Sequence, residues 1–351
     1  MSLAKFLGPI RGAVSLALLG TTLVFGAPAK AGDSLDLLSG VRTEVGSRLW
    51  VSAPHLDNRL FDPDGTPASR LVWDGSRSAS AEAFFRFDFS QTGLFIKGFA
   101  GGGLSTGGSL DDEDYAFNFP LPGGGTFSGT FLDTYMEGAR EPFGYAAADI
   151  GWTVPRFTSL PMSLGFFVGG FGSVDRFMGR GVRCNADDAQ NLFCPLGVQV
   201  VPLDTDVIAH ETRILGARLG VETKVALNEV LDWRIEAAYL AAGTFKLDDS
   251  HLLRTQTPDP SGPPNENALG PAPNIVSKSD TLTGVQLETE LAWRFAPQWT
   301  ASLGARYWHF DSGSAPVVFG ARLPAEFQGR GSTDKNTLDR LGVFTGISYR
   351  F

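Results

Sequence analysis

Hydrophobic and polar residues alternate with a period of two along most of the chain. The alternation is clearest at the C-terminal end, where Leu341, Val343 and Ile347 share one face and Arg340 and Ser348 share the other. Successive side chains of a β-strand point to opposite faces, so this pattern predicts strands with one apolar and one polar face. Ten segments show it: 38–53, 68–89, 93–110, 144–156, 161–178, 210–226, 231–247, 281–295, 298–313 and 339–351.

The connections between these segments alternate in length. Short turns fall at 90–92, 156–160, 227–231 and 296–297, and long loops at 54–67, 111–143, 179–209, 248–280 and 314–339. A membrane barrel needs an apolar face toward lipid and a polar face toward the lumen, with short turns at one end and long exterior loops at the other. An even strand number lets the sheet close without an unpaired edge. The prediction is an all-β fold, a ten-stranded antiparallel transmembrane β-barrel with long extracellular loops.

The composition agrees with a strand-built membrane protein. The chain has 43 glycines and 27 phenylalanines in 351 residues, and its mean hydropathy is close to zero. After the N-terminal region, no stretch approaches the roughly 20 apolar residues of a membrane helix. The final residue, Phe351, resembles the C-terminal signature of outer-membrane barrels in Gram-negative bacteria.

The first 31 residues have the features of a secretory signal peptide. Lys5 and Arg11 precede an apolar run over 13–25, and Ala29-Lys30-Ala31 matches a small-residue cleavage site. Cleavage after Ala31 would leave a barrel over 32–351 and would change the formal charge from −9 to −12, because it removes three cations and no acids. An ordinary N-terminal helix is the alternative. An acidic exported chain is unsuited to bind nucleic acid and would attract cationic partners.

Two cysteines lie close together in the third predicted loop. In an exported protein, a disulfide between Cys184 and Cys194 is favoured over two free thiols. Neither cysteine has the Cys and His neighbours of a zinc site, so no metal is expected.

Two short acidic stretches stand where predicted strands run into predicted loops. Asp112 and Asp114 follow a Gly-rich run, and Asp249 and His251 follow the seventh segment. Both pairs have i, i+2 spacing, which puts the two side chains of each pair on one face of an extended backbone. A solvated acidic loop is the simpler interpretation of either stretch alone. If the inward members meet across the mouth of the barrel, the four side chains form a single cluster instead.

At these residues the chain resembles the omptins, ten-stranded outer-membrane proteases with an Asp-x-Asp pair in the second loop and an Asp-x-His pair in the fourth. The likeness includes the run Ser69-Arg-Leu-Val-Trp73, the run 98–108 leading to Asp112-Glu-Asp114-Tyr115, and the hairpin over 145–180. It extends over the whole mature chain at low identity.

The resemblance implies an aspartic endopeptidase that faces the cell exterior from the outer membrane of a Gram-negative cell. His251 would be the general base that activates water, Asp249 would orient it, and Asp112 and Asp114 would hold the water from the other side. It implies no cofactor, lipopolysaccharide as a candidate activator, cationic peptides or proteins as substrates, and a monomer.

Three positions depart from the omptin pattern. Leu247 stands where omptins that cleave between basic residues have an acid, and Asp57 is only a loose candidate for a second specificity acid. In the region of the family's lipopolysaccharide-binding pattern, Arg176 is the remaining candidate for contact with a lipid A phosphate. A preference for dibasic substrates therefore does not follow.

The other three histidines are expected to have other roles. His210, beside Glu211, is interpreted as structural or surface-exposed, and His309 as part of the barrel lining or aromatic girdle. His55 is treated as incidental. His251 differs from them only through its spacing to Asp249 and its place in the topology.

Other functions fit the same barrel. The main alternative is a non-enzymatic barrel that serves as an adhesin or structural protein and has no need of His251. A pore is disfavoured because ten strands leave a lumen filled by side chains. The candidates for this filling are Glu288, Glu290, Arg294 and Arg306. A lipid A hydrolase would need a Ser/His pair facing lipid, which the sequence does not offer.

Overall fold

The structure is a computed structural model that describes residues 40–120, 124–154, 161–185, 194, 197–258 and 268–351. The described strands belong to one compact unit, Gly40–Phe351. The predicted signal peptide lies outside the described residues. Within these residues, no helix combines the length and the apolar character needed to cross a membrane.

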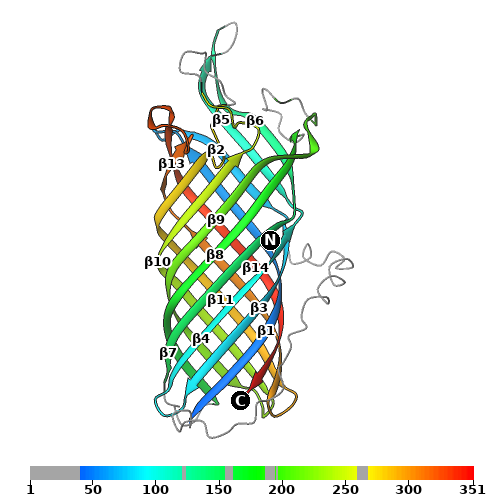
Figure 1. The fold of residues 1–351 in the computed structure, drawn as a ribbon, viewed down its shortest axis with the longest axis vertical. Helices are drawn as coiled ribbons and strands as arrows, with labels where there is room; N and C mark the ends of the chain where they lie inside the picture. Colours follow the sequence, from blue (N-terminus) through cyan, green and yellow to red (C-terminus); the bar gives the residue numbers. More distant parts are fainter. Residues whose placement is uncertain (1–39, 121–123, 155–160, 186–193, 195–196, 259–267) are drawn as a thin grey trace. The chain divides into compact units, whose positions relative to one another are not determined.

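The described strands form one antiparallel sheet that closes on itself, because β1 pairs with β14 (Figure 1). The strands are β1 (Val41–Phe61), β2 (Pro67–Asp74), β3 (Arg77–Phe89), β4 (Leu94–Thr106), β5 (Ser109–Pro120), β6 (Thr126–Gly138), β7 (Glu141–Thr153), β8 (Met162–Cys184), β9 (Gln199–Ala226), β10 (Leu231–His251), β11 (Ile275–Arg294), β12 (Trp299–Asp311), β13 (Ala315–Phe319) and β14 (Gly329–Arg350). A short 3₁₀ helix, η3 (Ala325–Phe327), precedes β14.

At four positions in the wall, two consecutive strands follow one another along the same neighbours and count as one strand of the ring. These are β2 and β3, β4 and β5, β6 and β7, and β12 and β13. Gly75, between β2 and β3, and Gly107 and Gly108, between β4 and β5, have positive φ angles that break the extended backbone. The ring therefore has ten strands, and the predicted ten-stranded antiparallel barrel is confirmed.

The predicted loop boundaries are wrong, because most of the residues assigned to long loops are strand. Pairing continues to Phe61 on β1, to Pro120 on β5, to Cys184 on β8 and to His251 on β10, and it begins at Gln199 on β9 and at Gly329 on β14. These segments are rich in polar residues, which suggested loops. Inter-strand hydrogen bonds nevertheless satisfy their backbone, and β5 and β6 extend past their neighbours at one end (Figure 1).

The outward face carries an apolar belt. Leu215, Leu303 and Val343 are 67, 61 and 59% exposed on this face, as contact with lipid requires. On β10 the belt runs from Trp233 to Tyr239. Asp249 and His251 lie ten and twelve residues beyond Tyr239, outside the belt.

The inward face is filled by ion pairs and, above them, by aromatic rings. In the charged layer, Arg306 Nη1 lies 2.7 Å from Glu82 Oε2, and Lys97 Nζ lies 2.6 Å from Glu236 Oε2. Toward the long-loop end, the rings of Trp50, Tyr145 and Phe171 pack around Trp308. These layers form a packed floor below the mouth of the barrel.

Candidate active site

Both predicted pairs face the inside of the barrel at its long-loop end. Asp112 and Asp114 lie on β5 opposite Leu71 and Ser69 of β2. Asp249 and His251 lie on β10, and Asp249 is 3% exposed. The alternation of the extended backbone thus places all four side chains in the mouth.

Asp249 and His251 form the first half of the site. The Nε2 atom of His251 lies 3.4 Å from Asp249 Oδ2. The fully buried Asn274, which precedes β11, holds the backbone of His251 from both sides: its Oδ1 accepts from the His251 N–H at 2.9 Å, and its Nδ2 donates to the His251 carbonyl at 3.1 Å. This double contact fixes the backbone from which the imidazole projects.

The electrostatics of this half favour a charged pair. Burial acts to lower the pKa of His251, but the Asp249 carboxylate outweighs it and holds this pKa above its ordinary value. Burial acts in the opposite direction on Asp249, where the two neighbouring imidazoles of His251 and His210 outweigh it and keep the pKa of the carboxyl well below its usual range. His251 is thus a stronger base than a free histidine.

Asp112 and Asp114 form the second half of the site, and both carboxyls have raised pKa values. Burial raises the pKa of Asp112 to about 8, the Asp114 charge adds to that rise, and His251 opposes it. Burial also raises the pKa of Asp114. The Ser69 hydroxyl donates to Asp112 Oδ1 at 3.4 Å.

The two halves face each other without direct contact. The charge of His251 acts on both Asp112 and Asp114, yet within the described residues its imidazole makes an ion pair only with Asp249. A base on one wall and a protonated acid on the other suit the activation of a water molecule between them. In the same described residues, no group of three or more His, Cys, Asp or Glu side chains is placed to hold a metal ion.

His210 is the residue that the sequence analysis missed. It lies on β9 directly opposite Asp249 in the register, it is 1% exposed, and its Nε2 atom lies 3.2 Å from Asp249 Oδ1. Of the two roles expected for His210, the surface position is therefore wrong and the structural one remains. Counting outward from the short β9–β10 turn would have placed His210 opposite Asp248, because a bulge in β10 shifts the register by one residue.

Neither Leu247 nor Asp57, two positions that depart from the omptin pattern, places an acid in the mouth of the barrel. Leu247 points inward, 2% exposed, in an apolar cluster. Asp57 pairs with Arg59 and Arg70 at a position of β1 that alternates with the inward-facing Leu56. It is therefore not in the mouth, and the loose expectation of a specificity acid there is wrong.

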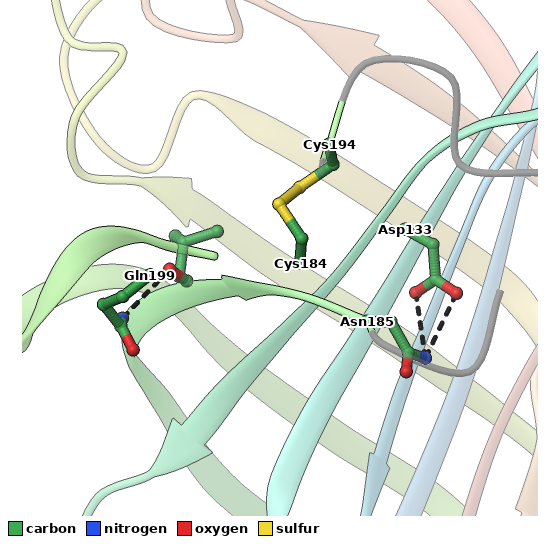
Figure 2. Close-up of a disulfide and its surroundings, with 6 residues drawn as sticks. Asp133, Cys184, Asn185, Cys194 and Gln199 are labelled. Carbon is green, nitrogen blue, oxygen red and sulfur yellow. Dashed lines mark hydrogen bonds between the residues drawn. A yellow bond between two sulfur atoms is a disulfide. The ribbon is translucent and has the colours of Figure 1, made fainter. Parts of the chain in front are cut away.

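Cys184 and Cys194 form a disulfide, as the sequence favoured (Figure 2). Next to it, the Asn185 amide donates to the Asp133 carboxylate at 3.1 Å, and Gln199 Nε2 donates to the Val182 carbonyl at 2.9 Å. These contacts tie the end of β8 to β6 and to β9. They brace the wall beside the site.

Sequence comparisons find no match: no protein-family model and no curated protein corresponds to the chain. Among solved structures, the chain is similar to the outer-membrane protease OmpT of Escherichia coli, with a TM-score of 0.64 and 14% identity over 88% of this chain and 97% of that one. Much weaker likenesses are to the attachment invasion locus protein Ail of Yersinia pestis (TM-score 0.28, 9% identity, 88% and 99% covered) and to a FadL homologue of Pseudomonas aeruginosa (0.26, 8%, 89% and 90%).

The match to OmpT concerns the complete ring of strands, since it covers nearly all of that chain. The resemblance inferred from the paired motifs is therefore confirmed at the level of the fold. The chain is a ten-stranded β-barrel with the omptin fold.

Proposed function

We propose that this protein is an omptin-type aspartic endopeptidase that cleaves peptides or proteins at the surface of a Gram-negative cell. The observation that carries the proposal is that His251 on β10, which lies beside Asp249, is near enough for its charge to act on both Asp112 and Asp114 of β5, beyond the apolar belt of a barrel with the OmpT fold. The substrates we expect are cationic, because the mature chain is acidic.

The proposed reaction uses water as the nucleophile. His251 takes a proton from the water as the water oxygen attacks the scissile carbonyl carbon, and Asp249 stabilises the imidazolium. Asp112, protonated at neutral pH because of its raised pKa, donates a hydrogen bond to the carbonyl oxygen as negative charge develops there. The imidazolium then gives its proton to the leaving amine. No acyl-enzyme forms, because no side chain attacks the substrate.

The pH dependence of cleavage tests this assignment. His251 must be neutral to act as a base, so activity should fall as pH drops below its pKa, which lies above 6.5. Asp112 must be protonated, so activity should also fall as pH rises past about 8. The expected result is a bell-shaped profile of kcat/KM for peptide cleavage by refolded protein with lipopolysaccharide present. A profile that is flat between pH 6 and 9 would contradict both roles.

A row of cations supports lipopolysaccharide as a partner. Arg213, Lys246 and Lys278 lie directly opposite one another on β9, β10 and β11. They border an outward-facing hollow whose lining includes Gly144 and Gly172. Cations just above the apolar belt are placed to meet lipid phosphates, and the small residues leave space for acyl chains.

Removing two of these three cations should remove most of the activation by lipopolysaccharide. For the double variant Arg213→Ala/Lys246→Ala we expect unchanged basal cleavage in detergent. We expect most of the stimulation to be lost, because each lost phosphate contact should weaken lipid binding about tenfold. The measurement is cleavage rate against lipopolysaccharide concentration. Arg42→Ala, an exposed cation at the short-turn end, is the matched control. Equal stimulation in all three proteins would rule out this site.

A binding barrel without catalysis is the second candidate function. The tip of β9 exposes Val198, Val200 and Leu203 at 47, 58 and 46%, and such apolar side chains at the exterior end could contact a partner. This candidate predicts that the wild-type protein cleaves no peptide and that a His251→Ala variant keeps its full binding to that partner.

A further inference from the structure

His210 has two polar neighbours in the interior of the barrel. The Nε1–H of Trp73, on β2, donates to His210 Nδ1 at 2.8 Å. An indole nitrogen can only donate, so Nδ1 must be the unprotonated nitrogen of a neutral imidazole. The single ring proton is then on Nε2, and that atom lies 3.2 Å from Asp249 Oδ1. Both atoms are buried and neither makes a well-aligned hydrogen bond within the described residues, so this short electrostatic contact is what each has for a polar partner.

Trp73 holds this tautomer in place. It is 1% exposed, its ring packs against Phe177 at 5.4 Å, and it meets the His210 ring edge-on at 5.7 Å. Trp73 lies on β2 and His210 on β9. Since both rings are enclosed, His210 cannot turn away from Asp249 without breaking the contact with Trp73.

The Asp249 carboxylate therefore lies between two imidazoles. Its Oδ1 faces His210 at 3.2 Å, and its Oδ2 faces His251 at 3.4 Å. A carboxylate that is 3% exposed has little water to satisfy it, so donors from the protein must do so. We propose that His210, locked by Trp73, is a positioning residue that orients Asp249 and thereby sets the basicity of His251. The catalytic consequence rests on the proposed function, but the contact itself does not.

Loss of the His210 donor has a consequence of definite sign. An uncompensated buried carboxylate binds the shared proton of the Asp249–His251 pair more tightly, so the pair should titrate at higher pH. The other charged groups that interact with His251 are Asp112 and Asp114 on β5 and Arg254 after β10. Asp112 raises the pKa of His251 and Arg254 lowers it. All three stay in place when His210 is changed.

The test is an NMR titration of the His251 imidazole in refolded protein, comparing wild type with His210→Phe and His210→Gln. We expect His210→Phe to move the His251 pKa upward by about one unit, as loss of one close polar contact to a buried charge implies. His210→Gln restores an N–H donor and should move it less than half as far. A pKa that is unchanged, or that falls toward 6.5 as in a loosened and hydrated site, would overturn the proposal.

A second variant keeps the test decisive if the His210 variants do not fold. Trp73→Phe retains an aromatic ring but removes the indole N–H, so the His210 tautomer is no longer fixed. The His251 pKa should then rise by a smaller amount than in His210→Phe. In the cleavage assay, the acid limb of the pH profile should move up with it, with kcat reduced and KM unchanged. If wild-type protein cleaves no peptide, the proposed function fails, while the titration still decides the role of His210.

Discussion

Replacing His251 with alanine should lower kcat for peptide cleavage by about 10³-fold, the range that loss of a general base produces. Within the described residues, His251 is the only imidazole at ion-pair distance from Asp249 whose charge is also seen to act on Asp112 and Asp114. The measurement is single-turnover cleavage of a cationic peptide by refolded protein with lipopolysaccharide.

The matched control is His309→Ala. His309 also has a carboxylate partner, because its Nδ1 lies 2.9 Å from Asp339 Oδ1, but this pair is about one-third exposed and stands apart from the candidate site. The control variant should cleave at the wild-type rate. Equal losses in the two variants would point to a general effect of losing a His–Asp contact and not to catalysis by His251.

The Asp112 side should also be sensitive, though less than His251. Asp112→Asn keeps the size of the side chain but cannot ionise, and it replaces the acidic O–H donor with a weaker amide N–H. We expect about a 10²-fold loss of kcat together with loss of the alkaline limb of the pH profile. Full activity in both His251→Ala and Asp112→Asn would remove the proposed mechanism while leaving the barrel assignment intact.

The second large effect concerns stability. Asp175→Asn should reduce the free energy of unfolding by about 3–5 kcal/mol, the range for breaking a buried ion pair. Asp175 and Arg340 are both buried and in direct contact, and within the described residues Arg340 has no other carboxylate partner. Its guanidinium would be left over the Phe143 ring without a counter-charge, with the neutral amide at position 175 and the hydroxyls of Ser52 and Ser78 as polar neighbours. Urea unfolding in lipid vesicles measures the change.

An exposed ion pair on the same strand provides the comparison. Arg180 on β8 lies 2.6 Å from Asp206, and their side chains are 48 and 44% exposed. Solvent screens such a pair, so Asp206→Asn should cost less than about 1 kcal/mol. Similar costs for the two substitutions would mean that the interior of the barrel is hydrated and that burial does not set the strength of its ion pairs.

The sequence was sufficient to predict the barrel because the alternation that a membrane strand requires is local to each strand. Each membrane strand must present apolar side chains to lipid and polar ones to the lumen, and this shows directly as a period of two, as at Leu341, Val343 and Ile347. The length of the strands beyond the membrane was not predictable in this way. Outside lipid, a paired strand needs no apolar face, so the polar extensions of β1, β9 and β14 resembled loops.

The sequence by itself determined that Asp249 and His251 share a face, since i, i+2 spacing fixes that in any strand. Only the tertiary structure decided which face. Tyr239 is on the lipid side, so an unbroken β10 would have put both residues on that side too. A bulge between Leu240 and Ala242 shifts the register by one residue, turns the pair inward and sets His210 opposite Asp249. Such a bulge depends on how neighbouring strands pair, which the pattern along one strand does not encode.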